Sequence, residues 1–349
     1  MNTKIKVAIN GLGRIGRSIF KLLLKEKDIL LIGINEINPD VQNWVYTLNY
    51  DSIYGKLENK VSFSGNKIIV GDQSFYTNNA NSLLDIPFLE WGVDILIDCT
   101  GVKENINNAK KALNNNQIKK VIFTHSPDEL DFYMILGVNE QEYNPNKHNL
   151  ISSSICDATA IAPVTKLIND LYKIKIGYVT TLHPWLSYQN LMDGPSSSWS
   201  VPGTVYHHYA LGRSAIGNMI PKPTSAMEAV FKVISNLNSN QIGSFSYRTP
   251  TQLVGSADIT YFVDKNLSKS QLVECLNEFE NKQNYPIIKL SDEPLVSSDY
   301  IGEEFSCIVD MRWLDVIDNQ LIKIVLWYDN EFGYCSNVIR QIKYIAQFF

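Results

Sequence analysis

The sequence has little that would mark a secreted, membrane-spanning or metal-binding protein. Its 349 residues include only five cysteines, an odd number, widely spaced and without a CxxC pair. This usage argues against a disulfide framework or a zinc site, so we expect no metal, and it favours a reducing, cytoplasmic location. No apolar run approaches the roughly 20 residues that span a bilayer, and no signal-peptide pattern opens the chain.

Strong charge of one sign is also missing. The formal net charge is −5, and the lysines and arginines are scattered rather than gathered into a basic stripe. We therefore expect no nucleic-acid partner. A hydrophobic content of 45% and a charged content of 19% are typical of globular proteins. Because the chain is long for one hydrophobic core, it predicts two domains.

The first part of the chain alternates between strand and helix patterns. Residues 5–10 and 29–35 are short apolar strands, and residues 14–25 form a helix with an apolar side. The same alternation continues with strands at 93–98, 121–124 and 133–137 and a helix at 105–113. Fully apolar strands between helices predict a parallel sheet covered on both faces.

The pattern changes from about residue 171. Residues 256–263 and 320–328 alternate in the manner of half-buried antiparallel strands, with loops between them rich in Gly, Pro and Ser. Residues 336–349 predict a terminal helix. The second part of the chain is therefore expected to be an α+β unit.

A glycine-rich turn joins the first strand to the first helix. Gly11 permits a tight turn, Gly13 lets the backbone approach a pyrophosphate, and Gly16 allows close packing of helix and strand. The helix N-terminus would then hold the phosphates. Glu36 follows the second strand, where an acid bonds the adenosine ribose and repels a 2′-phosphate. This pattern favours NAD over NADP as the cofactor. It also favours a cofactor-binding loop over a purely structural glycine loop.

Cys156 lies at a second junction between a strand and a helix. A lone cysteine is most often inert packing, and we assign that role to the other four. Cys156 differs because it follows three serines at the start of a helix and has His183, at a strand end, as a possible partner. A free cysteine has a pKa near ~8.5, which a helix N-terminus and an imidazolium can lower by several units. We therefore interpret Cys156 as a nucleophile.

Several longer motifs carry a family resemblance. They are Ile9-Asn-Gly-Leu-Gly-Arg-Ile-Gly-Arg17, Tyr50-Asp-Ser-Ile-Tyr-Gly55, Cys99-Thr-Gly-Val102, Gly137-Val-Asn139, Thr180-Thr-Leu-His183, Asp193-Gly-Pro-Ser196, Val296-Ser-Ser-Asp-Tyr300 and Trp327-Tyr-Asp-Asn-Glu-Phe-Gly-Tyr334. Over nearly its whole length the chain resembles the phosphorylating glyceraldehyde-3-phosphate dehydrogenases. The resemblance implies a Rossmann-type NAD-binding domain over residues 1–154, to which the helix 336–349 returns. It also implies an α+β catalytic domain with a mostly antiparallel sheet over residues 155–335, and a homotetramer.

The resemblance also implies roles for individual residues. Cys156 adds to an aldehyde to give a hemithioacetal, His183 acts as base, and hydride transfer to NAD leaves a thioester. Expected cofactor contacts are Asn10, Gly11, Gly13, Arg14, Ile15, Gly16, Glu36, Thr100, Thr124, Asn330 and Tyr334. Expected substrate contacts are Arg248, which matches the family's phosphate-binding arginine, with Thr224, Arg213 and Asp157.

The chain departs from the family around the cysteine. The family has Ser-Cys-Thr-Thr-Asn-Cys, whereas this chain has Ile155-Cys-Asp-Ala-Thr-Ala160. Hydroxyls that help to bind inorganic phosphate are thereby lost. After His183 a substrate-binding threonine is replaced by Leu186, the glycine after Thr224 becomes Ser225, and the loop 194–221 is lengthened.

Asp157 has two interpretations, which the sequence does not separate. Near a dianion site its carboxylate would weaken phosphate binding, because two like charges ~4 Å apart repel by about 4 kcal/mol at an effective dielectric of 20. Alternatively it is an acid in the first helical turn, favourable with the macrodipole by roughly 0.3–1 kcal/mol and directed away from the site.

Three functions follow. The first is NAD-dependent oxidation of glyceraldehyde 3-phosphate or a close phosphorylated aldehyde. The second keeps this redox step but acts on a different aldehyde or hydrolyses the thioester to a free acid, as in the related erythrose-4-phosphate dehydrogenases. The third is a catalytically inactive NAD-binding protein, which the retained Cys156, His183, Asn330 and Arg248 argue against.

Overall fold

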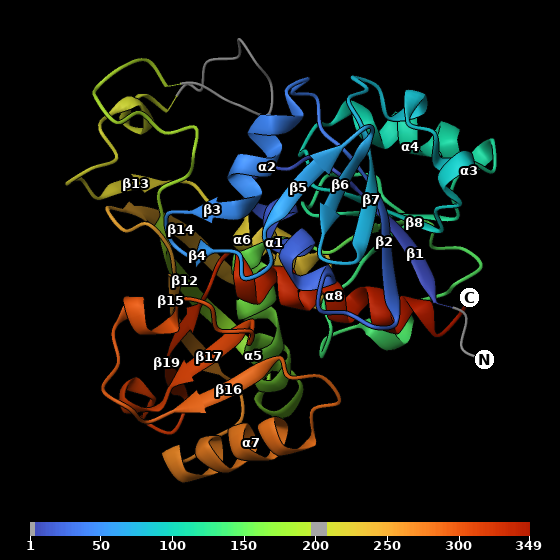
Figure 1. Ribbon diagram of the computed structural model, residues 1–349. Coiled ribbons are helices and arrows are strands. Elements are labelled where there is room, and N and C mark those ends of the chain that lie inside the picture. Colours follow the sequence, from blue (N-terminus) through green and yellow to red (C-terminus); the bar gives the residue numbers. More distant parts are fainter. Residues whose placement is uncertain (1–3, 197–207) are drawn as a thin grey trace. The chain divides into compact units, whose positions relative to one another are not determined.

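A computed structural model describes residues 4–196 and 208–349 (Figure 1). Residues in mutual contact divide the chain into two compact units. The first comprises Met1–Met134, Glu142–Ser154 and Val338–Phe349, and the second comprises Ile135–Gln141 and Ile155–Asn337. In the described ranges no helix is both long and apolar enough to cross a membrane.

The first unit is built on a nine-stranded sheet. Its strands, in spatial order, are β10 (Phe132–Tyr133), β11 (Leu150–Ser152), β9 (Lys120–Phe123), β8 (Ile95–Asp98), β1 (Ile5–Asn10), β2 (Ile29–Asn35), β7 (Gln73–Asn78), β6 (Lys67–Val70) and β5 (Val61–Ser64). The parallel order β7-β2-β1-β8-β9-β11 is that of a dinucleotide-binding sheet. Strand β6 pairs antiparallel with both β5 and β7, an extension that the sequence did not indicate.

Helices of the first unit bury apolar stripes. They are α1 (Arg14–Leu23), α2 (Val41–Asn49), α3 (Phe88–Trp91) and α4 (Glu104–Asn114), together with the part of α8 (Phe332–Ala346) from Val338 on. In α1, Ile19, Phe20 and Leu23 are almost fully buried. A short hairpin of β3 (Tyr50–Asp51) and β4 (Gly55–Lys56) stands apart from the main sheet.

Two predicted elements have a boundary that differs from the structure by more than two residues. The strand expected at 133–137 is confined to β10, because Val138 N–H bonds the Ile135 carbonyl and Gly137 takes a φ of +79°. The terminal helix begins at Phe332 rather than residue 336. Asp329 Oδ1 accepts hydrogen bonds from the backbone N–H groups of Glu331 and Phe332, which starts the helix inside the Trp327–Tyr334 motif.

The second unit is built on an eight-stranded, mostly antiparallel sheet. Its strands are β12 (Ile174–Pro184), β13 (Ile220–Lys222), β14 (Ile242–Thr249), β15 (Gly255–Val263), β16 (Ile288–Ser291), β17 (Cys307–Asp310), β18 (Asp315–Ile317) and β19 (Leu321–Tyr328). Only β12 with β14 and β16 with β17 pair in parallel. Together with the parallel sheet of the first unit, this architecture confirms the predicted fold class.

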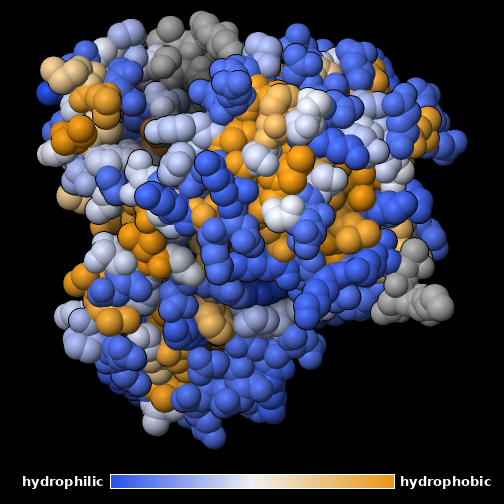
Figure 2. Space-filling model, in the orientation of Figure 1, coloured by the Kyte–Doolittle hydropathy of each residue, from blue (hydrophilic) through white to orange (hydrophobic). Residues whose placement is uncertain are grey.

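Among the described residues of this unit, the sheet is accompanied by the helices α5 (Cys156–Tyr172), α6 (Ala226–Phe231) and α7 (Lys269–Lys282), and by the first residues of α8. Helix α5 is buried along most of its length, including Ala158, Ile161 and Val164. Helix α7 instead buries only Leu272 and Leu276. Figure 2 shows its outer face as hydrophilic, whereas hydrophobic residues gather over the β5–β7 region of the first unit.

Candidate active site

The glycine turn after β1 has the geometry that a dinucleotide requires. Gly11 has a φ of +93°, and a Cβ there would lie 3.0 Å from the Thr100 methyl group. A Cβ on Gly16 would lie 1.9 Å from the Gly11 carbonyl oxygen. Neither position tolerates a side chain, because the strand and the helix approach each other closely.

Gly13 has a different reason to be glycine. A Cβ at this position would meet no heavy atom within 4 Å, and the backbone there is extended. Gly13 is the N-cap residue of α1, and as a glycine it has no side chain to occupy the helix N-terminus. The open space beside a helix N-terminus fits a pyrophosphate, as the fingerprint predicted.

Polar groups at the strand ends complete this part of the first unit. Glu36 accepts a hydrogen bond of 2.7 Å from Leu12 N–H, which holds its carboxylate against the glycine turn. Asn35 Nδ2 donates to Asn10 Oδ1 at 2.8 Å. The Arg14 side chain forms an ion pair of 2.8 Å with Asp51.

Thr100 and Thr124 follow β8 and β9, and both hydroxyls bond Asp98. Thr100 Oγ1 donates to Asp98 Oδ1 at 2.6 Å, and Thr124 Oγ1 donates to the Asp98 carbonyl at 3.1 Å. Burial raises the pKa of the Asp98 carboxyl. Because β1 and β8 are neighbours, Gly11 and Thr100 lie at the switch point of the sheet, where such folds bind dinucleotides.

In the second unit, Cys156 is the first residue of α5. Ser154, two residues earlier, has a φ of +62°, an uncommon value for a residue with a side chain that marks a sharp entry into the helix. The N-cap residue, Ile155, provides no side-chain cap. Cys156 is partly exposed, whereas Cys307 and Cys335 are buried. The local chain therefore presents the sulfur at a helix N-terminus.

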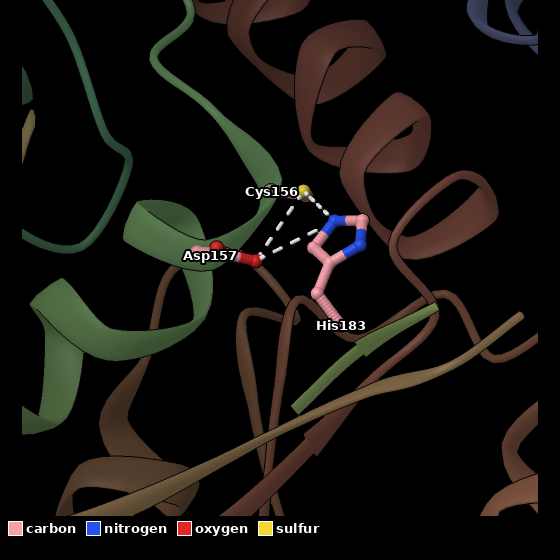
Figure 3. Close-up of side chains that lie close together, drawn as sticks. All are labelled: Cys156, Asp157 and His183. Atoms are coloured by element: carbon pink, nitrogen blue, oxygen red, sulfur yellow. Dashed lines mark hydrogen bonds and ion pairs between the residues drawn. The ribbon is translucent and has the colours of Figure 1, made fainter. Parts of the chain in front are cut away.

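His183 lies within contact distance of this sulfur. Its Nε2 atom is 3.5 Å from Cys156 Sγ, and its Nδ1 atom is 2.8 Å from the Pro184 carbonyl oxygen (Figure 3). Since a carbonyl can only accept, Nδ1 must carry a proton, which leaves the Nε2 lone pair directed at the thiol. This is the arrangement of a nucleophile and its general base.

Asp157 points toward the same two side chains, not away from them. Its Oδ1 atom lies 3.6 Å from Cys156 Sγ and 3.8 Å from His183 Nε2 (Figure 3). The same oxygen accepts a 2.8 Å hydrogen bond from the Tyr328 hydroxyl. Asp157 is thus an acid in the first turn of α5 and also a charge beside the thiol. The interpretation in which it points away from the site is wrong.

These surroundings do not favour a resting thiolate. Burial and the negative charge of Asp157 raise the pKa of the Cys156 thiol well above its ordinary value. Burial and the Arg248 charge lower the pKa of His183 to about 4. The shift of the thiol pKa is opposite to the lowering expected from the sequence. Both shifts favour a neutral thiol beside a neutral imidazole, because desolvation and the Asp157 charge act against the helix N-terminus.

Arg248 is brought to His183 by strand register. The two residues are direct partners on the parallel strands β12 and β14. The Arg248 side chain is buried, and its two contacts are long: 3.4 Å to the Pro184 carbonyl and 3.3 Å to the Tyr188 hydroxyl. Its Nε atom has no hydrogen-bond partner within the described part of the chain. A buried guanidinium with such weak contacts is suited to bind an anionic group.

Two cluster members were not found from sequence. Burial and the Arg248 charge lower the pKa of Lys222 to about 8, and the charges of Asp157 and Cys156 act in the opposite direction. Tyr328 was quoted only as part of a motif. Lys222 precedes Thr224, a predicted substrate contact, by two residues. The proximity of Lys222 to Thr224 in sequence could therefore have pointed to Lys222.

The remaining predicted substrate contacts have other partners. Thr224 Oγ1 accepts from Ala226 N–H at 3.2 Å. Arg213, an exposed side chain, bonds Asp193 at 2.9 Å. Trp199, Tyr206 and His207 of the lengthened loop lie outside the described residues.

Asn330 and Tyr334 also belong to the second unit, and both are buried. Asn330 Oδ1 accepts a 3.0 Å hydrogen bond from Val254 N–H. Val254 has a φ of +70°, which is strained for a β-branched residue. The bond fixes the amide so that its Nδ2 is the group available as a donor.

Comparison with known proteins identifies the family. Residues 5–106 match the profile of the glyceraldehyde 3-phosphate dehydrogenase NAD binding domain, and residues 155–330 match that of its C-terminal domain. The chain is 32% identical to glyceraldehyde-3-phosphate dehydrogenase 1 of Bacillus subtilis over 98% of both chains. It is 31% identical to the enzyme of the same name from Kluyveromyces marxianus, over 98% of this chain and 100% of the relative. The cytosolic glyceraldehyde-3-phosphate dehydrogenase of Chlamydomonas reinhardtii is 32% identical, over 99% of this chain and 98% of the relative.

These matches confirm the predicted cofactor, NAD, and the predicted class of enzyme. The chain belongs to the glyceraldehyde-3-phosphate dehydrogenase family of NAD-dependent oxidoreductases.

Proposed function

We propose that this chain oxidises a phosphorylated aldehyde, glyceraldehyde 3-phosphate in the first instance, with Cys156 as nucleophile and His183 as general base. The observation that carries the proposal is the 3.5 Å contact between Cys156 Sγ and His183 Nε2, with Nδ1 committed to the Pro184 carbonyl. Bound NAD would supply the hydride acceptor, and Asn330 and Tyr334 keep their proposed roles as cofactor contacts.

The neutral resting pair determines how the first step proceeds. As Cys156 Sγ bonds the carbonyl carbon, the thiol proton moves to His183 Nε2. His183 then passes this proton to the carbonyl oxygen, which gives the hemithioacetal and leaves Nε2 free to act as base again. Loss of hydride from carbon and of the hydroxyl proton to the base then leaves a thioester on Cys156. His183 is poised for this task because its lowered pKa keeps Nε2 unprotonated at neutral pH.

Arg248 is the proposed contact for the substrate's phosphate. It is a buried cation with no carboxylate within ion-pair distance in the described parts of the chain, and its Nε atom has no partner. Lys222, whose charge acts on the same cluster, adds a second cation on this side. An anionic group on the aldehyde would complement both charges.

A second candidate differs in the fate of the thioester. The Asp157 carboxylate faces the thiol at 3.6 Å, and Ile155 and Ala158 provide no hydroxyl donors there. A fixed negative charge opposes an incoming phosphate dianion but not water. Attack by water on the thioester would release a free acid and return the proton to Cys156 through His183.

The experiment is to follow NADH formation from glyceraldehyde 3-phosphate with and without inorganic phosphate, and to identify the product. Strict dependence on phosphate with an acyl phosphate product supports the first function and excludes the second. Turnover without phosphate to a free carboxylate supports the second. Absence of NADH with a panel of phosphorylated aldehydes, despite normal NAD binding, would overturn both.

The cytoplasmic location and the homotetramer are part of this proposal. None of the five cysteines, which all lie in the described part of the chain, forms a disulfide, and this suits a reducing compartment. Light scattering of the purified protein tests the tetramer, since a monomer mass would contradict it.

A further inference from the structure

We propose that Cys156, Asp157 and His183 form a three-ligand zinc site that holds the enzyme in an inactive state. The metal site itself rests on the three side chains alone, whereas its effect on activity rests on the function proposed above. It was not visible in the sequence, where the cysteines lack metal-site spacing and His183 comes from a different element, β12.

The donor set is typical of zinc. A thiolate sulfur, an imidazole nitrogen and a carboxylate oxygen are the three ligand types that zinc binds in proteins. All three are present here, one from each residue, with their ligand atoms within 4.8 Å of one another. The family motif Ser-Cys-Thr-Thr-Asn-Cys has threonine where this chain has Asp157. The third ligand is therefore a residue in which this chain differs from that motif.

The distances fit a tetrahedral ion. Zinc bonds sulfur at about 2.3 Å and nitrogen or oxygen at about 2.0–2.2 Å, so ligand atoms of one tetrahedral site lie about 3.3–3.6 Å apart. The measured separations are 3.5 Å for Sγ to Nε2, 3.6 Å for Sγ to Oδ1 and 3.8 Å for Nε2 to Oδ1. The triangle therefore needs to contract by only a few tenths of an ångström.

Outer partners already orient two of the ligands. His183 Nδ1 donates to the Pro184 carbonyl, which leaves Nε2 as the ligating atom, and Asp157 Oδ1 accepts from the Tyr328 hydroxyl. Such contacts are what ligating histidines and carboxylates use in zinc proteins. Cys156 is partly exposed, which is compatible with entry of an ion and with a water in the fourth position.

The charges also balance. Binding converts the thiol to a thiolate and releases its proton, so that one thiolate, one carboxylate and one Zn²⁺ sum to zero. Arg248 and Lys222, whose charges act on this cluster, then face a neutral group rather than a dication. While the ion is bound, neither the sulfur nor Nε2 is available to an aldehyde.

The test measures Zn²⁺ itself on the NAD-free protein, by competition with a chromogenic chelator, with proton release followed in weak buffer. We expect one tight site per chain and about one proton released per ion. Loss of even an outer-sphere partner typically weakens metal affinity about 10- to 100-fold, so Asp157→Asn and Cys156→Ser should each weaken it at least tenfold. Cys156→Ser should also abolish proton release.

Two controls keep the result specific. Asp292→Asn removes an exposed carboxylate of the same unit, and Cys275→Ser removes another thiol; both should leave the affinity unchanged. Circular dichroism establishes that each variant is folded. Substituted Co²⁺ should give the absorption of a tetrahedral thiolate complex in the wild type, and Zn²⁺ should protect Cys156 from alkylation.

The proposal is overturned if wild-type protein shows no tight site. It is also overturned if Asp157→Asn binds Zn²⁺ as tightly as wild type, because Asp157 would then not be a ligand. Loss of Zn²⁺ affinity in Cys275→Ser but not in Cys156→Ser would overturn it as well.

Discussion

The hydroxyl of Tyr328 donates a 2.8 Å hydrogen bond to Asp157 Oδ1, and that same oxygen faces Cys156 Sγ and His183 Nε2. Tyr328 ends strand β19 and Asp157 is the second residue of helix α5, so two elements far apart in sequence fix one carboxylate beside the nucleophile. The consequences of this placement can be measured.

Replacing Asp157 by Asn should make Cys156 more reactive. The change removes a negative charge that raises the pKa of the thiol, so the thiolate fraction at neutral pH should increase. We expect alkylation of Cys156 by iodoacetamide at pH 7 to accelerate about three- to tenfold. Asp292→Asn, an exposed acid in the same unit, should leave the rate unchanged. A slower rate in Asp157→Asn would show that the carboxylate activates the sulfur.

Stability should fall at acid pH because of His183. Its pKa is lowered to about 4 in the folded protein, chiefly by burial, whereas an unfolded histidine titrates near ~6.5. As the pH falls from about 6.5 through about 4, the unfolded chain gains a proton that the folded one excludes. The free energy of unfolding should therefore drop by about 3 kcal/mol from this group.

The check is urea unfolding of wild type and His183→Asn between pH 7 and 4. His125 in the first unit also has its pKa lowered to about 4 by burial, so it gives a contribution of the same sign. His183→Asn should flatten the pH dependence of stability partly, and the double variant with His125→Asn should flatten it further. Identical slopes in wild type and His183→Asn would contradict the buried, neutral imidazole.

Arg248 and Arg213 should differ in their effect on substrate binding. Arg248 is buried, and its Nε atom has no hydrogen-bond partner among residues 4–196 and 208–349, whereas Arg213 is exposed and paired with Asp193. A charge-assisted hydrogen bond contributes about 1.5–3 kcal/mol, so Arg248→Gln should raise KM for glyceraldehyde 3-phosphate about 10- to 100-fold. KM for unphosphorylated glyceraldehyde should hardly change.

Arg213→Gln is the matched comparison in steady-state assays. We expect it to alter KM by less than about threefold. An equal rise in KM for both variants would restore Arg213 as a substrate contact, as the sequence suggested.

The glycines of the fingerprint should separate folding from NAD binding. Gly16→Ala places a methyl group 1.9 Å from a backbone oxygen and should cost at least about 2 kcal/mol of stability. The methyl group of Gly13→Ala would have no heavy atom within 4 Å, so this variant should fold normally. Its affinity for NAD should fall about tenfold or more, because the methyl group occupies the space proposed for the pyrophosphate. Melting temperature and NAD titration measure the two effects. Normal NAD affinity in Gly13→Ala would contradict the assignment of that space.

Local patterns were sufficient to predict much of the fold. The strands Ile5–Asn10 and Ile29–Asn35 were bounded correctly because most of their side chains are buried, which leaves a largely apolar run in the sequence. Strands β5 and β6 were missed, since half of their side chains or more are not fully buried and the apolar signal is interrupted.

The identity of the main site residues could be predicted from the sequence, whereas the contacts between their side chains could not. Cys156 and His183 could be named from sequence, whereas the pairing of His183 with Arg248 depends on the register of β12 against β14. The direction of Asp157 depends on the Tyr328 hydroxyl, which comes from the far end of the chain. Long-range contacts of this kind leave no local pattern.

The central claim is that Cys156 carries the acyl group. Its most direct test mixes the protein rapidly with NAD and glyceraldehyde 3-phosphate in the absence of inorganic phosphate, and follows NADH and the mass of the Cys156 peptide together. We predict a burst of about one NADH per chain and an acyl mass increase on Cys156, with neither seen in Cys156→Ser. Formation of NADH at the same rate in Cys156→Ser, or an acyl group on any other residue, would contradict the account.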